Sequence, residues 1–241
     1  MTVTYIFHSC YLLEFDSFSI IFDFYKDEKR EDGLFWVNDY LLEKADDLYV
    51  FCTHSHSDHF NPEVLGWKVK KPNIKYIFSK EVLESREIPD CQDIIFLDKL
   101  QTYEDNRLKV KTFGSTDVGG SFLVNVSGQR FFHAGDLNNW HWNEEVPKLE
   151  AAGYENNYLC QLELVAENVD QLYLAMFPVD PRLGKDYMRG AEQLVNRIST
   201  DYFLPMHFGE EYEKANAFSR YARLQNCTYL NVYKKGQSFE L

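Results

Sequence analysis

Three histidines and one aspartate lie within six positions of the chain, as His54, His56, Asp58 and His59. Neutral imidazole and carboxylate groups are good ligands for a divalent cation such as zinc. In an extended or tightly turning segment, His54 and His56 point the same way because side chains alternate with a period of two. Asp58 and His59 then fall in the following turn and can face a second point. The spacing therefore suggests two adjacent metal ions.

The histidine content of the chain favours a metal site over a polar surface loop. The whole sequence has only seven histidines, and three of them lie in this segment around a carboxylate. The apolar run 48–52 directly precedes the segment and predicts a buried strand. A rigid strand followed by a loop is a common arrangement for presenting binding residues.

The pattern His-x-His-x-Asp-His after a strand resembles the signature of the metallo-β-lactamase-fold hydrolases. Further matches follow in the order that this family implies, at 20–23, 131–136 and 203–209. These segments resemble, in turn, the strand ending in an Asp that supports the metal loop, the strand ending in the metal-bridging Asp, and the strand delivering the last His ligand. The His8 segment, Gly135-Asp136 and Pro205-Met206-His207 look most like the branch containing L-ascorbate-6-phosphate lactonase.

The resemblance implies a role for each matching residue. The first metal would be held by His54, His56 and Asp117, the second by Asp58, His59 and His207, and Asp136 would bridge the two. Asp58 and Asp136 are the carboxylates expected to take part in catalysis. Asp23 would support the metal loop without touching a metal, and His8 would line the site or make a structural hydrogen bond.

One position departs from the family pattern. The family usually supplies a third His to the first metal from a segment resembling Gly-His-Thr-Pro-Gly-Ser, whereas this chain reads Thr116-Asp117-Val118-Gly119-Gly120-Ser121. Asp117 then stands where that His would be. A carboxylate is a harder ligand and would shift the preference toward manganese or iron. The alternative is that Asp117 only orients a ligand and leaves the first site incomplete.

Two segments are candidates for contacting the substrate. Trp140 and His141 lie in the aromatic loop 138–142, just past the expected bridging Asp, although a packed loop would explain them equally well. Arg182 lies in the loop 178–184, and its guanidinium suits carboxylate or phosphate groups. A surface salt bridge is the alternative for Arg182.

The expected chemistry is hydrolysis. Two divalent ions, zinc or else manganese or iron, can share one hydroxide that attacks an ester, lactone, amide or phosphodiester bond of a small substrate. A phosphodiesterase or nuclease of the same fold is one alternative, and a non-catalytic metal-binding module is another. A di-iron redox protein of flavodiiron type fits less well, because those relatives have Glu where His56 stands and carry a flavin domain.

The composition limits the partners and the location. The formal net charge of −13 disfavours nucleic acid, whose binding depends on neutralising phosphates with Lys and Arg. Five scattered cysteines without a Cys-x-x-Cys pair indicate no disulfide framework. No signal peptide or membrane-spanning apolar stretch is seen, so we expect no membrane association and a cytoplasmic location. The oligomeric state is not predicted.

The element pattern predicts one α+β domain over residues 1–241. Strands are expected at 5–8, 11–15, 19–24, 48–52, 75–78, 93–97, 107–113, 121–126, 129–133, 171–177, 202–206, 229–233 and 237–241. Helices are expected at 36–44, from 62, and at 79–85, 144–166, 190–198 and 210–224. Two strand-rich halves that each acquire helices imply two mixed sheets packed face to face. That is the four-layer αββα sandwich of the family that the chain resembles.

Overall fold

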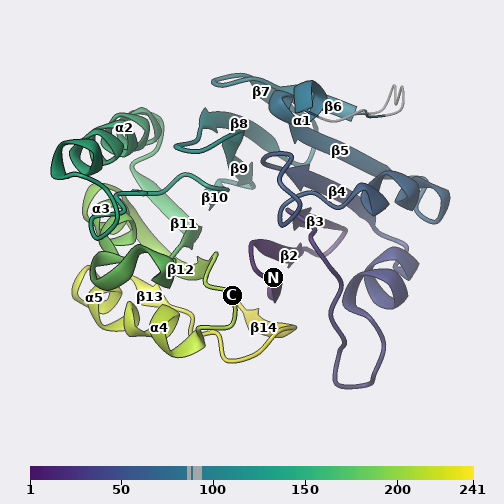
Figure 1. The fold of residues 1–241 in the computed structure, drawn as a ribbon. Coiled ribbons are helices and arrows are strands. Elements are labelled where there is room, and N and C mark those ends of the chain that lie inside the picture. The colour runs from purple at the N-terminus through teal and green to yellow at the C-terminus, as the bar shows by residue number, and fades with distance from the viewer. Residues whose placement is uncertain (86–87, 89–93) are drawn as a thin grey trace. The chain divides into compact units, whose positions relative to one another are not determined.

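The computed structural model describes residues 1–85, 88 and 94–241 (Figure 1). Their contacts divide the chain into two compact units, Met1–Leu97 with Tyr233–Leu241, and Asp98–Val232. Each unit is built on one seven-stranded sheet. The first unit is discontinuous in sequence, because its last strand comes after the whole of the second unit.

The sheet of the first unit has the strand order β14-β1-β2-β3-β4-β5-β6. The strands are β1 (Thr2–Phe7), β2 (Cys10–Glu14), β3 (Phe18–Phe22), β4 (Asp47–Cys52), β5 (Ile74–Ser79), β6 (Ile94–Leu97) and β14 (Gln237–Glu240). β14, β1, β2 and β3 pair antiparallel, whereas β3 to β6 pair in parallel. β3 and β4 read as near-continuous apolar runs, as expected for parallel strands that are buried on both faces.

Short helical segments cover the parallel strands of this unit. They are a π-helical turn (Trp36–Tyr40), 3-10 helices (Leu41–Glu43 and Pro62–Val69) and α1 (Lys80–Ser85). Asn61 begins the helix at Pro62 because its side chain accepts a hydrogen bond from Glu63 N at 2.9 Å. Trp67 packs from that helix into the apolar core with Ile21, Val50 and Phe78.

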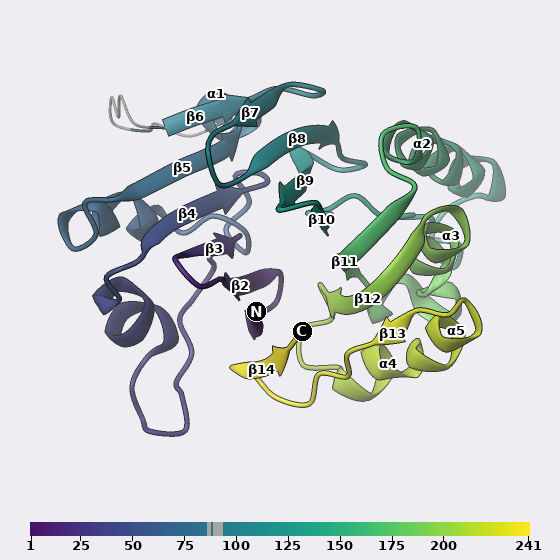
Figure 2. The same cartoon turned by 180° about the vertical axis from the view of Figure 1, so that it is seen from behind.

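The second sheet has the order β13-β12-β11-β10-β9-β8-β7. Its strands are β7 (Thr102–Glu104), β8 (Lys109–Gly114), β9 (Gly120–Val126), β10 (Gln129–His133), β11 (Gln171–Pro178), β12 (Ser199–Met206) and β13 (Thr228–Tyr229). β7 to β10 pair antiparallel and β10 to β13 in parallel. The helices of this unit, α2 (Lys148–Ala166), α3 (Arg189–Arg197), α4 (Tyr212–Ala217) and α5 (Ser219–Leu224), lie on one side of β11 and β12 (Figure 2).

Most predicted elements are present, and the differences have local causes. The helix expected at 144–166 begins at Lys148, after Pro147, which has no N–H to donate within a helix. The helix expected at 210–224 is divided at the buried Phe218 into α4 and α5. The strand expected at 229–233 is limited to Thr228–Tyr229, and the short edge strand β7 was not predicted. Residue 93, where another strand was expected to begin, lies outside the described residues.

Within the described residues, no helix combines the length and apolar character needed to span a membrane.

Two glycine substitutions test the packing of the second unit. A Cβ at Gly120 would lie 2.7 Å from the backbone oxygen of Phe113, whereas a Cβ at Gly153, inside α2, would meet nothing within 4 Å. Gly120→Ala should therefore lower the free energy of unfolding by about 1–3 kcal/mol. Gly153→Ala should raise it by about 0.5–1 kcal/mol, because alanine favours a helix interior. Urea unfolding of both variants measures the two effects, and equal stabilities would contradict this packing.

Candidate metal centre

The candidate ligands of the first unit lie just beyond the ends of two neighbouring parallel strands. β3 and β4 pair in parallel with Phe22 opposite Phe51, and Asp23 N donates to Phe51 O at 3.0 Å. Asp23 therefore sits beside the loop 53–59, which leaves β4. The carboxyl ends of parallel strands meet at one edge of a sheet, so this closeness follows from the topology.

Asp23 is fully buried and holds the loop through three hydrogen bonds. Its carboxylate accepts from Thr53 N at 2.8 Å, from Thr53 Oγ1 at 2.7 Å and from His59 Nδ1 at 2.7 Å. The bond to His59 places the imidazole proton on Nδ1, which leaves the lone pair of Nε2 to face a cation. Asp23 was predicted to support the loop that carries the histidines. These three hydrogen bonds are the contacts that it makes with that loop.

His54 and His56 converge, as their alternating spacing predicts. His54 Nε2 lies 3.1 Å from His56 Nδ1. Two imidazole nitrogens on one tetrahedral zinc, at about 2.0–2.1 Å each, would be separated by roughly 3.3 Å. Glu81 of α1 fixes the residue between them by accepting from Ser55 N at 2.8 Å and from Ser55 Oγ at 2.7 Å. The two nitrogens are within hydrogen-bonding distance and are also close enough to bind one ion together.

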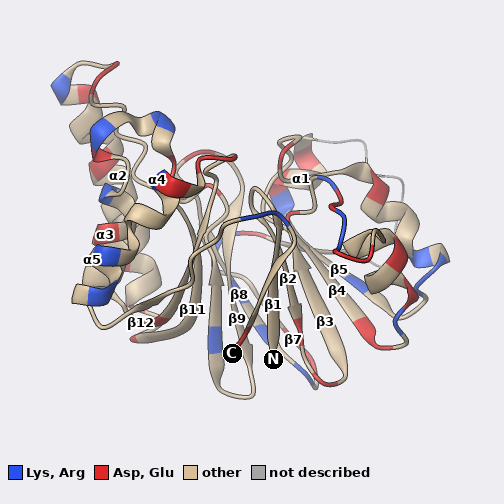
Figure 3. Ribbon diagram, turned by 90° about the horizontal axis from the view of Figure 1, so that it is seen from below, with Lys and Arg blue, Asp and Glu red and all other residues tan. Residues whose placement is uncertain are grey.

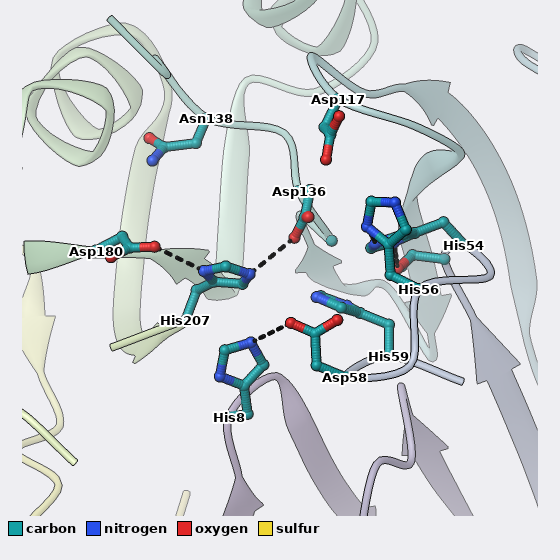
Figure 4. Close-up of polar contacts among 12 residues, drawn as sticks. His8, His54, His56, Asp58, His59, Asp117, Asp136, Asn138, Asp180 and His207 are labelled. Carbon is teal, nitrogen blue, oxygen red and sulfur yellow. Dashed lines mark hydrogen bonds and ion pairs between the residues drawn. The ribbon is translucent and has the colours of Figure 1, made fainter. Parts of the chain in front are cut away.

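Asp58 and His8 meet at the same end of the first sheet (Figure 4). His8 Nε2 lies 3.2 Å from Asp58 Oδ2, and this hydrogen bond is the main reason that the pKa of Asp58 is well below its usual range. One ligand atom from each of His8, Asp58 and His59 lies within 4.8 Å of the others. His8 was expected to line the site or to make a structural hydrogen bond, and it lies as close to Asp58 and His59 as a ligand would.

The second unit brings together Asp117, Asp136 and His207. Asp117 and Asp136 each offer an oxygen within 4.8 Å of the other, and His207 Nε2 lies 3.4 Å from Asp136 Oδ1 (Figure 4). Thr116 Oγ1 donates to the backbone oxygens of Asp136 at 3.2 Å and Asn138 at 2.6 Å. These bonds tie the loop carrying Asp117 to the loop carrying Asp136, which follows β10.

Asp180 orients His207 in the way that Asp23 orients His59. The two residues follow the neighbouring parallel strands β11 and β12, and His207 Nδ1 lies 2.8 Å from Asp180 Oδ2. Burial opposes ionisation of this carboxyl, but hydrogen bonds from His207 and Arg182 outweigh it and lower the pKa of Asp180 from 3.8 to about 2. Asp180 was not predicted to hold His207. The signal was available as an Asp immediately past a predicted strand, next to the strand that delivers His207.

Two of the three residues predicted to contact substrate line a pocket of the second unit. The pocket has a volume of about 360 Å³. It is lined by Thr116, Asp117, Asp136, Trp140, Trp142, Tyr154, Arg182 and His207. Trp142 and Tyr154 were not predicted, because neither belongs to the ligand pattern.

Arg182 and His141 make protein contacts of their own. The Arg182 guanidinium pairs with Asp180, with Nε at 3.0 and 2.9 Å from the two carboxylate oxygens. His141 is buried; its Nε2 lies 3.1 Å from Asp186 O, and its Nδ1 accepts from Asn143 N at 3.1 Å. His141 therefore holds the loop together, and a substrate contact from it stays a prediction.

The donor sets fit divalent cations. In each unit a buried carboxylate binds the Nδ1 of a buried histidine, an arrangement typical of metal-binding imidazoles. Carboxylates gathered at one place repel each other, and a cation relieves that repulsion. The residues present could hold zinc, and the carboxylate Asp117 also suits manganese or iron.

The chain matches the family model described as the beta-lactamase superfamily domain over residues 2–151. The protein therefore belongs to that family, and the two mixed sheets with their helices confirm the predicted α+β fold class. No curated protein matches the chain.

Solved structures share the fold at low sequence identity. Igni18, a metallo hydrolase from Ignicoccus hospitalis, is 15% identical with a TM-score of 0.66, covering 100% of this chain and 98% of that one. CmlA, a diiron β-hydroxylase from Streptomyces venezuelae, is 13% identical with a TM-score of 0.69, covering 100% and 54%. An isothiocyanate hydrolase from Delia radicum gut bacteria is 13% identical with a TM-score of 0.55, covering 100% and 99%.

Replacing Asp23 tests how the histidines are oriented. Asp23→Asn removes the negative charge that holds His59 Nδ1, so we expect the affinity for zinc to fall about 10- to 100-fold. Titration of the metal-stripped protein against a competing chelator measures the affinity. Asp46→Asn is the matched control, because Asp46 pairs with Lys44 and Lys71 before β4, at the other end of that strand from the loop. Equal affinity in both variants would contradict the role given to Asp23.

The low pKa of Asp180 predicts a stability change with pH. Because the pKa of Asp180 falls from 3.8 to about 2 on folding, its ionised form stabilises the native state above about pH 4. That contribution, about 2 kcal/mol, is lost as the pH falls through about 2. Urea unfolding of metal-stripped wild type and Asp180→Asn between pH 5 and pH 2 should show their stability difference shrinking. A constant difference would argue against the assignment.

Proposed function

We propose that the protein is a metal-dependent hydrolase that holds a pair of divalent cations. His54, His56 and Asp117 would bind one cation, Asp58, His59 and His207 the other, and Asp136 both. The observation that carries this proposal is the pair of buried carboxylate–imidazole contacts, Asp23 with His59 and Asp180 with His207. A carboxylate at Nδ1 is typical of imidazoles that bind metal through Nε2, and family membership over residues 2–151 supports the proposed ligands in that range.

The chemistry combines the cations with this chain's own acid and base groups. Bound divalent ions supply Lewis acidity and lower the pKa of water to near neutrality. Asp58 stays ionised at neutral pH, since its pKa lies well below its usual range. His8 Nε2 lies 3.2 Å from Asp58 Oδ2, so this imidazole would orient the carboxylate toward the cation.

The substrate is a small molecule with an ester, lactone, amide or phosphodiester bond. The pocket of about 360 Å³ lies near the lower end of the range for small-molecule sites, roughly 300–1,000 Å³. Basic and acidic residues are interspersed along both units (Figure 3), and the net charge is −13. A polynucleotide would need a basic surface, so the phosphodiesterase alternative is restricted to small substrates. Lactones are the first candidates to assay, given the resemblance to the lactonase branch.

Zinc is the proposed metal, and iron or manganese is the alternative. The imidazole-rich donor set suits zinc, whereas the carboxylate of Asp117 suits a harder ion. The diiron centre named for CmlA belongs to a protein that shares the fold at 13% identity, and this chain covers 54% of it. We also propose a cytoplasmic location, because the scattered cysteines suit a reducing compartment.

The proposal is tested by removing single ligands. His207→Ala and Asp58→Ala should each lower the metal content from two ions per chain to about one. Turnover of a panel of lactones, thioesters and chromogenic phosphodiesters should fall at least about 10³-fold, since removing one cation removes Lewis-acid stabilisation. Elemental analysis and initial rates measure these effects. Glu213→Ala, at an exposed site on α4, serves as the control.

Full metal content together with full activity in His207→Ala would refute the ligand assignment. Loading with metals but no turnover of any substrate in the panel would favour a non-catalytic metal-binding module.

A further inference from the structure

We propose that the aromatic wall of the pocket in the second unit binds an aryl group, so that the substrates are small molecules with an aromatic ring next to the scissile bond. The aromatic wall consists of Trp140, Trp142 and Tyr154. Its neighbours in the pocket include the candidate metal ligands Asp117, Asp136 and His207. The inference rests on the proposed function and names the substrate class for the same site.

Trp140 fixes the aromatic wall relative to the candidate ligands. Its Nε1 donates to Asp136 O at 2.8 Å, and its ring centroid lies 5.4 Å from that of His207 at an interplanar angle of 66°. The ring is 9% exposed, so only a small part of it can touch a ligand. Trp140 thereby supplies the inner end of the wall, directly beside the residues that would hold metal.

Trp142 extends the same wall outward. Its ring lies nearly parallel to that of Trp140, at an interplanar angle of 15° and a centroid distance of 6.2 Å. Its backbone has φ +43°, a conformation that bulky residues rarely adopt. Trp142 O accepts from Glu145 N at 2.8 Å and from Val146 N at 3.0 Å, which fixes this conformation. Backbone conformations of this kind tend to cluster at ligand-binding and catalytic sites.

Tyr154 completes the wall from α2. The residue is 38% exposed, so part of its ring can contact a ligand in the pocket. Its hydroxyl donates to Glu150 Oε1 at 2.8 Å, so one edge of the ring is oriented by its own helix. The face of the ring is then available to a flat apolar group, which aromatic side chains contact through offset stacking or edge-to-face packing.

The size and charge of the pocket favour a neutral aryl group. A cavity of about 150 Å³ holds benzene, so about 360 Å³ can take one ring and the bond to be cleaved. Aromatic walls also bind quaternary ammonium groups. Here the pocket is shared by Arg182 and by the cations that Asp117 and Asp136 would hold, so the metal-loaded pocket disfavours a cationic ligand.

The test compares two acyl groups of similar apolar size. Initial rates of the metal-loaded enzyme with phenylacetyl and cyclohexylacetyl thioesters of one thiol give the ratio of kcat/KM. We expect a preference of about 3- to 10-fold for the phenylacetyl ester, from stacking beyond burial. Trp142→Leu and Tyr154→Leu should reduce the ratio to about one. Tyr154→Phe keeps the ring and should retain the preference, and so should Leu149→Ala, at an 87% exposed position on the same helix.

A second measurement separates this inference from the hydrolase proposal. Metal-stripped protein is titrated with phenylacetamide and cyclohexylacetamide, with tryptophan fluorescence as the readout. Tighter binding of phenylacetamide, weakened at least 3-fold in Tyr154→Leu but not in Tyr154→Phe, supports the aryl site even if no ester is turned over. Turnover without an aryl preference, or binding of cyclohexylacetamide at least as tight as that of phenylacetamide, overturns the aryl site and leaves the hydrolase proposal standing.

Discussion

A buried carboxylate bound to the Nδ1 of a histidine is the interaction on which both halves of the candidate centre depend. It occurs once in each unit, with Asp23 and His59 at 2.7 Å and with Asp180 and His207 at 2.8 Å. In both cases the carboxylate follows one parallel strand, and the histidine is delivered by the neighbouring strand or its loop. The pairing of the two strands thus sets the tautomer and direction of the imidazole. A shift in the register of either strand pair would move its histidine away from the carboxylate that orients it. The pairing of the strands therefore determines where each candidate ligand lies.

Backbone strain is concentrated around the same residues. Four of the seven non-glycine residues with positive φ in the described chain are His8, Asp23, Trp142 and His207. Such conformations cost free energy and persist only where surrounding contacts enforce them. Asp23 has three hydrogen-bond donors around its carboxylate, and Trp142 has two backbone bonds to its carbonyl. The protein therefore gives up some stability to aim these side chains.

The sequence predicts the ligands that are close together in the chain better than those that meet through the fold. His54 and His56 could be paired from their spacing alone, because side-chain alternation operates within one segment. The partnership of Asp180 with His207 joins positions 27 residues apart and requires knowing that β11 and β12 are neighbours. Resemblance supplied His207 but not its partner.

Other parts of the site were beyond prediction for similar reasons. Trp142 and Tyr154 join one pocket only because the loop after β10 meets the start of α2. The break between α4 and α5 is invisible in composition, since the segment 210–224 has the residues of a single amphipathic helix. The strand pattern and the fold class were predictable because apolar runs bounded by turn residues are local signals.

The pairing of β14 with β1 has a consequence for biosynthesis. β1 is made before the whole of the second unit, and its partner Gln237–Glu240 leaves the ribosome after all of residues 98–232. Strand β1 of the first sheet therefore lacks its partner until β14 is made. The second unit, which is continuous in sequence, can already fold by then. During translation the unpaired edge of β1 is exposed to other chains, and the late arrival of β14 closes it.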